Sequence, residues 1–201
     1  MQSRIVRTSR SLVAIFAIDA LGNIGFPAYS LGALVLASSR LHAGAGGYGL
    51  LIAAYGLGSL LGNLIVGNLG SSRWSVPLAV GGWSGIGLGF VGLALSHSLG
   101  WAIAAVALAG CCGATAHVSR ATYIGQTVPD QHLAKVHSLR SISTTAAGAA
   151  GTALMGWLMD RLPPELVIGT TGAALLVAGL LALATQRALP SAATPSFLKA
   201  E

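Results

Sequence analysis

The residues of this chain that are best suited to chemistry are ionisable and amide side chains set within apolar stretches. Asp19 is the only acidic residue inside such a stretch, and Asn23 follows it by four positions, about one helical turn. In another apolar stretch, Arg120 follows His117 by three positions. Burying a charge at the centre of a membrane span costs at least about 2.5 kcal/mol, so such residues are candidates for function. We therefore treat these four residues as candidate site residues.

Two interpretations of these side chains stay open. In the functional one, Asp19 binds a proton or a cationic substrate, and Arg120 is its partner in a switch between conformations. In the structural one, the two residues form a static ion pair, or Arg120 extends its charged end toward the membrane surface. His117 is either a titrating group or a hydrogen-bonded packing residue. Asn63 either lines a cavity between the helices or forms a hydrogen bond across a helix interface.

The composition excludes a soluble domain and a disordered chain. Hydrophobic residues make up 54% and charged residues 8% of the 201 residues, against about 25% charged residues in soluble domains. Disorder requires low hydrophobicity. Glycine, with 28 residues, is about twice as frequent as usual, which is typical of helices packed in a membrane.

Six apolar blocks have about the length of 20 residues that crosses a bilayer as a helix. They cover residues 11–39, 48–70, 75–95, 99–123, 141–159 and 166–186. The predicted fold class is an all-α membrane protein with six transmembrane helices. We expect three parts: a basic N-terminus over 1–10, a six-helix domain over 11–186, and a C-terminal tail over 187–201.

The basic residues predict the orientation of these helices. Nine of the eleven Lys and Arg residues fall on the side of the two termini, and only Arg40 and Arg161 fall on the other. The nine are Arg4, Arg7, Arg10, Arg73, Arg120, Lys135, Arg140, Arg187 and Lys199. Because basic loops stay in the cytoplasm, both termini are predicted to be cytoplasmic, in a multi-pass protein of the plasma membrane, the inner membrane of a bacterium.

Small residues recur every four positions in four of the blocks, and such stripes let helix backbones approach closely. Two of the stripes matter below: Ala54, Gly58 and Gly62 in the second block, and Gly148, Thr152 and Gly156 in the fifth. They predict a tightly packed bundle rather than isolated membrane anchors.

Two motifs resemble the major facilitator superfamily of transporters, specifically the C-terminal half of its drug and siderophore exporters. Residues 44–67 read GAGGYGLLIAAYGLGSLLGNLIVG, in which Tyr48 and Gly49 match an outer loop that leads into Y-G-L-L. Residues 126–136 read QTVPDQHLAKV and match a cytoplasmic loop with a V-P-D turn before a basic position. The resemblance covers about residues 40–160.

This resemblance implies a six-helix half-bundle that transports a small amphipathic solute, coupled to protons, in the direction of efflux. The pathway of such a carrier lies between two halves, so the partner is a second six-helix half, from the same chain, a split partner or a homodimer. It also implies a gating loop between the second and third helices, here from Gly67 to Arg73. The loop keeps one arginine and lacks the acidic residue that is usual in the family.

Other classes of function are less well supported. A non-transporting membrane scaffold, or a remnant of a truncated transporter, is the alternative. Residues 82–85 (GWSG) resemble the G-x-S-G of rhomboid-type proteases, but a serine nucleophile needs a histidine base and residues 166–186 contain no histidine. The histidines and cysteines lack the spacing of metal ligands, no cofactor motif is present, and the basic residues indicate membrane topology rather than nucleic acid. We expect no enzyme, metal or cofactor.

Overall fold

The computed structural model describes residues 2–69, 75–128 and 130–187, which form six α-helices. All of the predicted helices are therefore present, and no strand occurs in these ranges. The helices are α1 (Gln2–Ser39), α2 (Gly44–Leu69), α3 (Ser75–Ala94), α4 (Leu99–Thr127), α5 (Asp130–Met159) and α6 (Pro164–Arg187).

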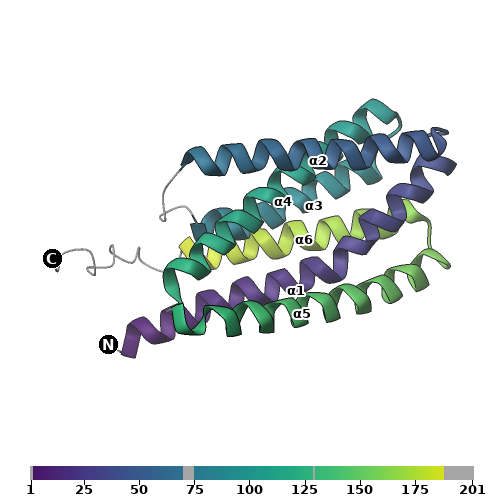
Figure 1. The fold of residues 1–201 in the computed structure, drawn as a ribbon. Helices are drawn as coiled ribbons and strands as arrows, with labels where there is room; N and C mark the ends of the chain where they lie inside the picture. The colour runs from purple at the N-terminus through teal and green to yellow at the C-terminus, as the bar shows by residue number, and fades with distance from the viewer. Residues whose placement is uncertain (1, 70–74, 129, 188–201) are drawn as a thin grey trace.

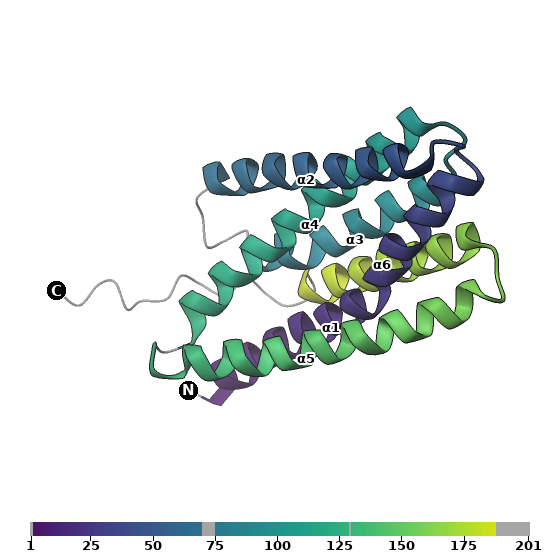
Figure 2. The same cartoon turned by 45° about the vertical axis from the view of Figure 1, so that its right-hand side comes forward.

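The helices run alternately up and down in one elongated bundle (Figure 1). The turns from α1 to α2, from α3 to α4 and from α5 to α6 lie together at one end. The start of α1, the α4–α5 turn and the end of α6 lie at the opposite end, which the charge pattern predicts to be cytoplasmic (Figure 2).

The packing places α3 at the centre of the contacts. It packs against α4 on one side and α6 on the other, while α2 packs mainly on α4, and α5 mainly on α1. In contrast, α4 touches α1 and α5 at only a few positions, and α5 barely contacts α6. Two outer helices, α2 and α5, are thus each held along one side only.

Glycine is needed where α2 crosses α4. A Cβ atom on Gly58 would collide with the backbone carbonyl group of Ala107, and one on Gly62 with that of Cys111. On the other helix, a Cβ atom on Gly110 would meet the carbonyl oxygen of Tyr55. The stripe predicted for residues 54–62 is therefore a packing face. The stripe on α5 differs, because added Cβ atoms on Gly148 and Gly156 would meet open space.

Within the described part of the chain, five of the helices are long and apolar enough to cross a membrane. The remaining helix, α5, has the length but not the hydropathy. It begins at Asp130, eleven residues before the predicted start at Ser141, so its first turns carry charged and polar side chains. Residues 141–153 of this helix are rich in Ser, Thr, Ala and Gly rather than in large aliphatic residues.

At the end of the bundle opposite the α4–α5 turn, Arg40 holds several segments together. Its guanidinium group donates to the carbonyl oxygen of Ala94 at 3.0 Å, contacts the His97 Nδ1 atom at 3.1 Å, and lies 3.9 Å from Glu165. Arg40 thereby links the end of α1 to the α3–α4 turn and the start of α6.

The close crossing of α2 and α4 can be tested with one methyl group. Gly58→Ala is expected to lower the free energy of unfolding in detergent by about 1–3 kcal/mol, because the added atom overlaps rigid backbone. Gly56→Ala, on the same helix in open space, is the matched control and should change it by less than about 0.5 kcal/mol. Equal stability of the two variants would contradict the close contact.

Candidate functional site

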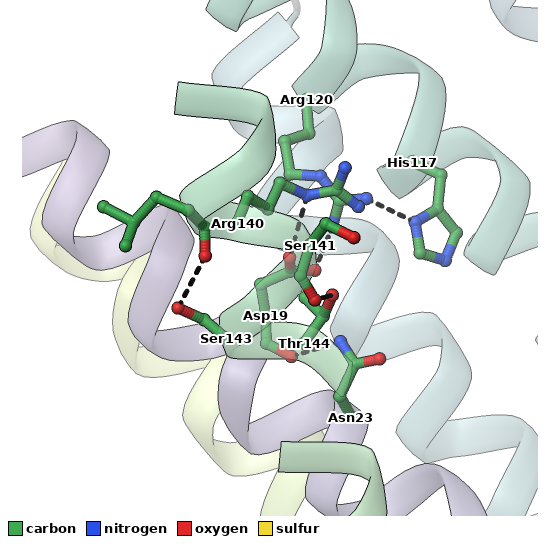
Figure 3. Close-up of polar contacts among 9 residues, drawn as sticks. Asp19, Asn23, His117, Arg120, Arg140, Ser141, Ser143 and Thr144 are labelled. Carbon is green, nitrogen blue, oxygen red and sulfur yellow. Dashed lines mark hydrogen bonds and ion pairs between the residues drawn. The ribbon is translucent and has the colours of Figure 1, made fainter. Parts of the chain in front are cut away.

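Three charged side chains from three helices meet inside the bundle. The Asp19 carboxylate on α1 accepts a hydrogen bond from Arg120 on α4 through Oδ1, and one from the Nε atom of Arg140 on α5 through Oδ2, at 3.3 Å (Figure 3). The side chains of Asp19 and Arg120 are only 1% and 5% exposed, whereas that of Arg140 is 26% exposed. We call Asp19, Arg120 and Arg140 the charged cluster.

Two polar neighbours hold the charged cluster in place. The second terminal nitrogen of Arg120 contacts the His117 Nδ1 atom at 2.6 Å. A guanidinium group only donates, so Nδ1 accepts and the ring is in its neutral form with the proton on Nε2. On α1, the Asn23 side-chain amide donates to the Asp19 carbonyl oxygen at 2.7 Å. Trp83 on α3 packs edge-on against the His117 ring.

The depth of the cluster is similar on each helix. Asp19 lies eight residues beyond Ser11, Arg120 seven residues before the end of α4, and Arg140 ten residues after the start of α5. At 1.5 Å per residue, these separations correspond to about 12, 10 and 15 Å. The charges therefore lie well inside the end of the bundle that holds the α4–α5 turn, where an unpaired ion would be costly.

The comparisons with known proteins identify the family. The family model described as Major Facilitator Superfamily matches residues 11–199. The chain belongs to the major facilitator superfamily. Comparison with curated proteins and with solved structures gave no match.

Family membership and helix composition together establish the general function. This superfamily consists of membrane transporters, and five helices of the chain have the length and hydropathy of membrane spans. The protein is therefore a multi-pass membrane protein of a transporter family, and its six helices agree with one half of a major facilitator superfamily bundle.

A cluster of aromatic rings lies farther along α1 from the charged cluster. Tyr29 stacks on Tyr55 of α2 and on Phe90 of α3, with ring centroids 5.5 and 5.4 Å apart. Phe26 packs edge-on against Tyr29 and Tyr55. Phe26 is exposed and Tyr55 half-buried, while the buried Tyr29 hydroxyl group has no hydrogen-bond partner in the described part of the chain. We call Phe26, Tyr29, Tyr55 and Phe90 the aromatic cluster.

The structure brings together four of the predicted site residues. Asp19, Asn23, His117 and Arg120 all lie in or against the charged cluster. Asn63 does not: it is exposed on α2 and has no hydrogen bond to the charged cluster. Of the predicted gating loop, Gly67 is exposed near the end of α2, and Arg73 lies outside the described residues. Ser84 is buried against Gly179, with no hydrogen-bond partner among the described residues.

Sequence reasoning missed Arg140 and the aromatic cluster. The charge pattern groups Arg140 with the cytoplasmic loops, because the fifth apolar block starts at about Ser141, although its helix can start earlier; in the structure Arg140 lies in the third turn of α5. The available indication was the absence of Gly or Pro between Asp130 and Arg140, which allows one continuous helix. Tyr29 and Tyr55 gave no comparable indication, because single aromatic residues in apolar blocks are normally packing residues.

The two arginines should differ in their contribution to stability. Arg120→Gln is expected to lower the free energy of unfolding by about 3–5 kcal/mol, because it removes a buried partner of both Asp19 and His117. Arg140→Gln leaves the Asp19–Arg120 pair balanced and should cost about 1 kcal/mol or less. Unfolding of the two purified variants in detergent, with Arg161→Gln at the opposite end as control, measures the difference. A larger loss from Arg140→Gln would contradict the assigned roles.

Proposed function

We propose that this chain moves a small amphipathic solute across the membrane as half of a proton-coupled carrier. The observation that carries the proposal is the buried charged cluster, which joins three helices that otherwise touch one another unevenly. α1 and α5 pack together, whereas α4 contacts either of them at only a few positions. The Asp19–Arg120 ion pair is therefore a main link between α4 and the α1–α5 pair.

A proton on Asp19 would loosen that link. Protonation removes the negative charge that both guanidinium groups share, so the ion pairs to Arg120 and Arg140 weaken together. α4 could then shift relative to α1 and α5, as alternating access requires. In this scheme Asp19 accepts the proton, Arg120 and Arg140 respond to it, His117 keeps the Arg120 side chain oriented, and Asn23 bonds the main chain of α1 at Asp19.

The direction of transport and the location of the protein in the cell are proposed from its sequence motifs and its charged residues. The motifs at 44–49 and 126–135 resemble those of drug and siderophore exporters, which supports outward transport. The excess of basic residues at the α4–α5 end supports cytoplasmic termini in a bacterial inner membrane. The loop from Gly67 to Arg73 would contribute to gating in a reduced form, and Asn63 would face the pathway or the second half.

A second six-helix half is the proposed partner. The face of α5 turned away from α1 exposes hydroxyl groups, and Cβ atoms added to the half-buried Gly148 and Gly156 would meet no atom of the described residues. Its exposed Ser143 and Thr152 donate back to carbonyl oxygens of their own helix. Such a face suits a helix interface or an aqueous pathway better than lipid. The second half would come from the same polypeptide, a split partner or a second copy.

Proton coupling at Asp19 is tested with Asp19→Asn in proteoliposomes. An internal pH dye would report proton movement when the probe solutes tetraphenylphosphonium and 6-phenylhexanoate are added in turn. We expect the wild type to move protons with at least one probe and Asp19→Asn to fall to background, because the amide cannot accept the proton. Asp160→Asn, an exposed acid outside the cluster, should behave as wild type. Unchanged proton movement in membrane-inserted Asp19→Asn would reject the coupling role.

Association with a second half is tested by the mass of the detergent-solubilised complex. We expect a particle that contains twelve or more membrane helices, either as a dimer of this chain or as a complex with another six-helix unit. A bulky change on the open face of α5, Gly148→Leu, should reduce the mass, whereas Gly67→Leu, in open space near the end of α2, should not. A strict monomer without transport would favour the non-transporting scaffold or a transporter remnant.

A further inference from the structure

The charged cluster is not electrically balanced. One carboxylate, Asp19, contacts two guanidinium groups, and the hydrogen bond at His117 Nδ1 requires a neutral imidazole ring. Among the described residues, no second carboxylate forms an ion pair with either arginine. The cluster therefore carries about one excess positive charge inside the bundle, where unmatched charge is costly.

The excess charge is accessible on Arg140. Its Nε atom is engaged by Asp19, but in the described part of the chain no hydrogen bond reaches its two terminal nitrogens. Its side chain is 26% exposed, against 5% for Arg120. The terminal nitrogens of an arginine form a planar fork that binds a carboxylate through two parallel hydrogen bonds. Both oxygens of Asp19, in contrast, already accept hydrogen bonds, so little remains to attract a cation.

The aromatic cluster lies farther along α1 from Asp19, the carboxylate that Arg140 contacts. Phe26 follows Asp19 by seven residues on the same helix, which corresponds to about 10 Å along α1. Phe26 and Tyr55, whose rings are 5.9 Å apart, are its two rings that are not fully buried. They offer an apolar surface to a group near the middle of the membrane.

We propose that the solute is an amphipathic monocarboxylate, with its carboxylate on the terminal nitrogens of Arg140 and its apolar end against Phe26 and Tyr55. A single negative charge balances the cluster, whereas a phosphate monoester, with a charge of about −1.5 to −2, would exceed it. This inference rests on the proposed function, because it takes the charged cluster to lie on the transport pathway. It replaces the cationic substrate that Asp19 alone would suggest.

The same arrangement links the proton to the anion. Neutralising Asp19 raises the excess positive charge of Arg120 and Arg140, with His117 as the neutral neighbour, so it strengthens the attraction for a carboxylate. By reciprocity, a bound carboxylate favours the proton on Asp19. Proton and acid would then move together, outward when the acid accumulates inside the cell.

Matched probes test the charge of the solute. Binding of 6-phenylhexanoate, its amide and 6-phenylhexylamine to the detergent-solubilised full chain would be measured by calorimetry. These three compounds share one shape and differ in charge, and the acid spans about the separation given above. We expect the acid to bind at least about tenfold more tightly than the amide or the amine, as a charge-assisted hydrogen bond provides. Equal binding of all three probes, tighter binding of the amine, or no binding of any probe would overturn the proposal.

Variants then locate the carboxylate. Arg140→Gln should weaken binding of the acid about tenfold and leave the amide unaffected, Arg140→Lys should retain part of the affinity, and Arg161→Gln, an exposed arginine at the other end, should bind as wild type. Asp19→Asn should bind the acid more tightly than wild type. Full affinity in folded Arg140→Gln would overturn the site; if that variant does not fold, an Arg140→Lys variant with no preference for acid over amine would do so.

The two proposals fail in distinguishable ways. Charge-selective binding that depends on Arg140, without any transport in proteoliposomes, would contradict the carrier function and leave the anion site standing. Proton movement that depends on Asp19 but responds to tetraphenylphosphonium, and not to 6-phenylhexanoate, would support the carrier and overturn the anionic solute.

Discussion

The structure depends on one buried carboxylate that two arginines share. Asp19 has almost no exposure to solvent, so its charge is tolerable only because Arg120 and Arg140 donate to it. Those two residues lie 101 and 121 positions along the chain from Asp19, and α4 has few other contacts with α1 and α5. The ion pairs thus hold α4 to α1 and α5, as the close glycine contacts hold α2 to α4.

These two kinds of helix contact suit different tasks. Backbone against backbone, as at Gly58 and Ala107, is rigid and offers no group whose charge can change. An ion pair in a nearly dry environment changes strongly when one proton or one anion arrives, because little water screens it. The proposed carrier needs both: α2, α3, α4 and α6 would form a fixed part that keeps its shape, and the contacts of α1 and α5 with α4 would be those that are exchanged.

Much of the candidate site could be predicted from the sequence, because membrane burial makes polar residues conspicuous. Asp19, Asn23, His117 and Arg120 stand out in apolar blocks, and all four lie together in the structure. Arg140 could not be assigned in the same way, since its block begins with polar residues and hydropathy marks only the apolar part of a helix. Asn63 is equally conspicuous in the sequence but lies apart from the cluster. The composition of a helix does not show in which direction each of its side chains faces.

The sequence by itself determined the six helices, their alternation and the family, because hydropathy, loop charges and short motifs are local properties that need no knowledge of the fold. Only the tertiary structure decided that one carboxylate faces two guanidinium groups, and that Tyr29 and Tyr55 stack beside Phe26. Those facts depend on the rotation and depth of each helix in the bundle. Rotation and depth are set by packing between distant segments, so the arrangement of charges in the site emerges only once the helices are assembled.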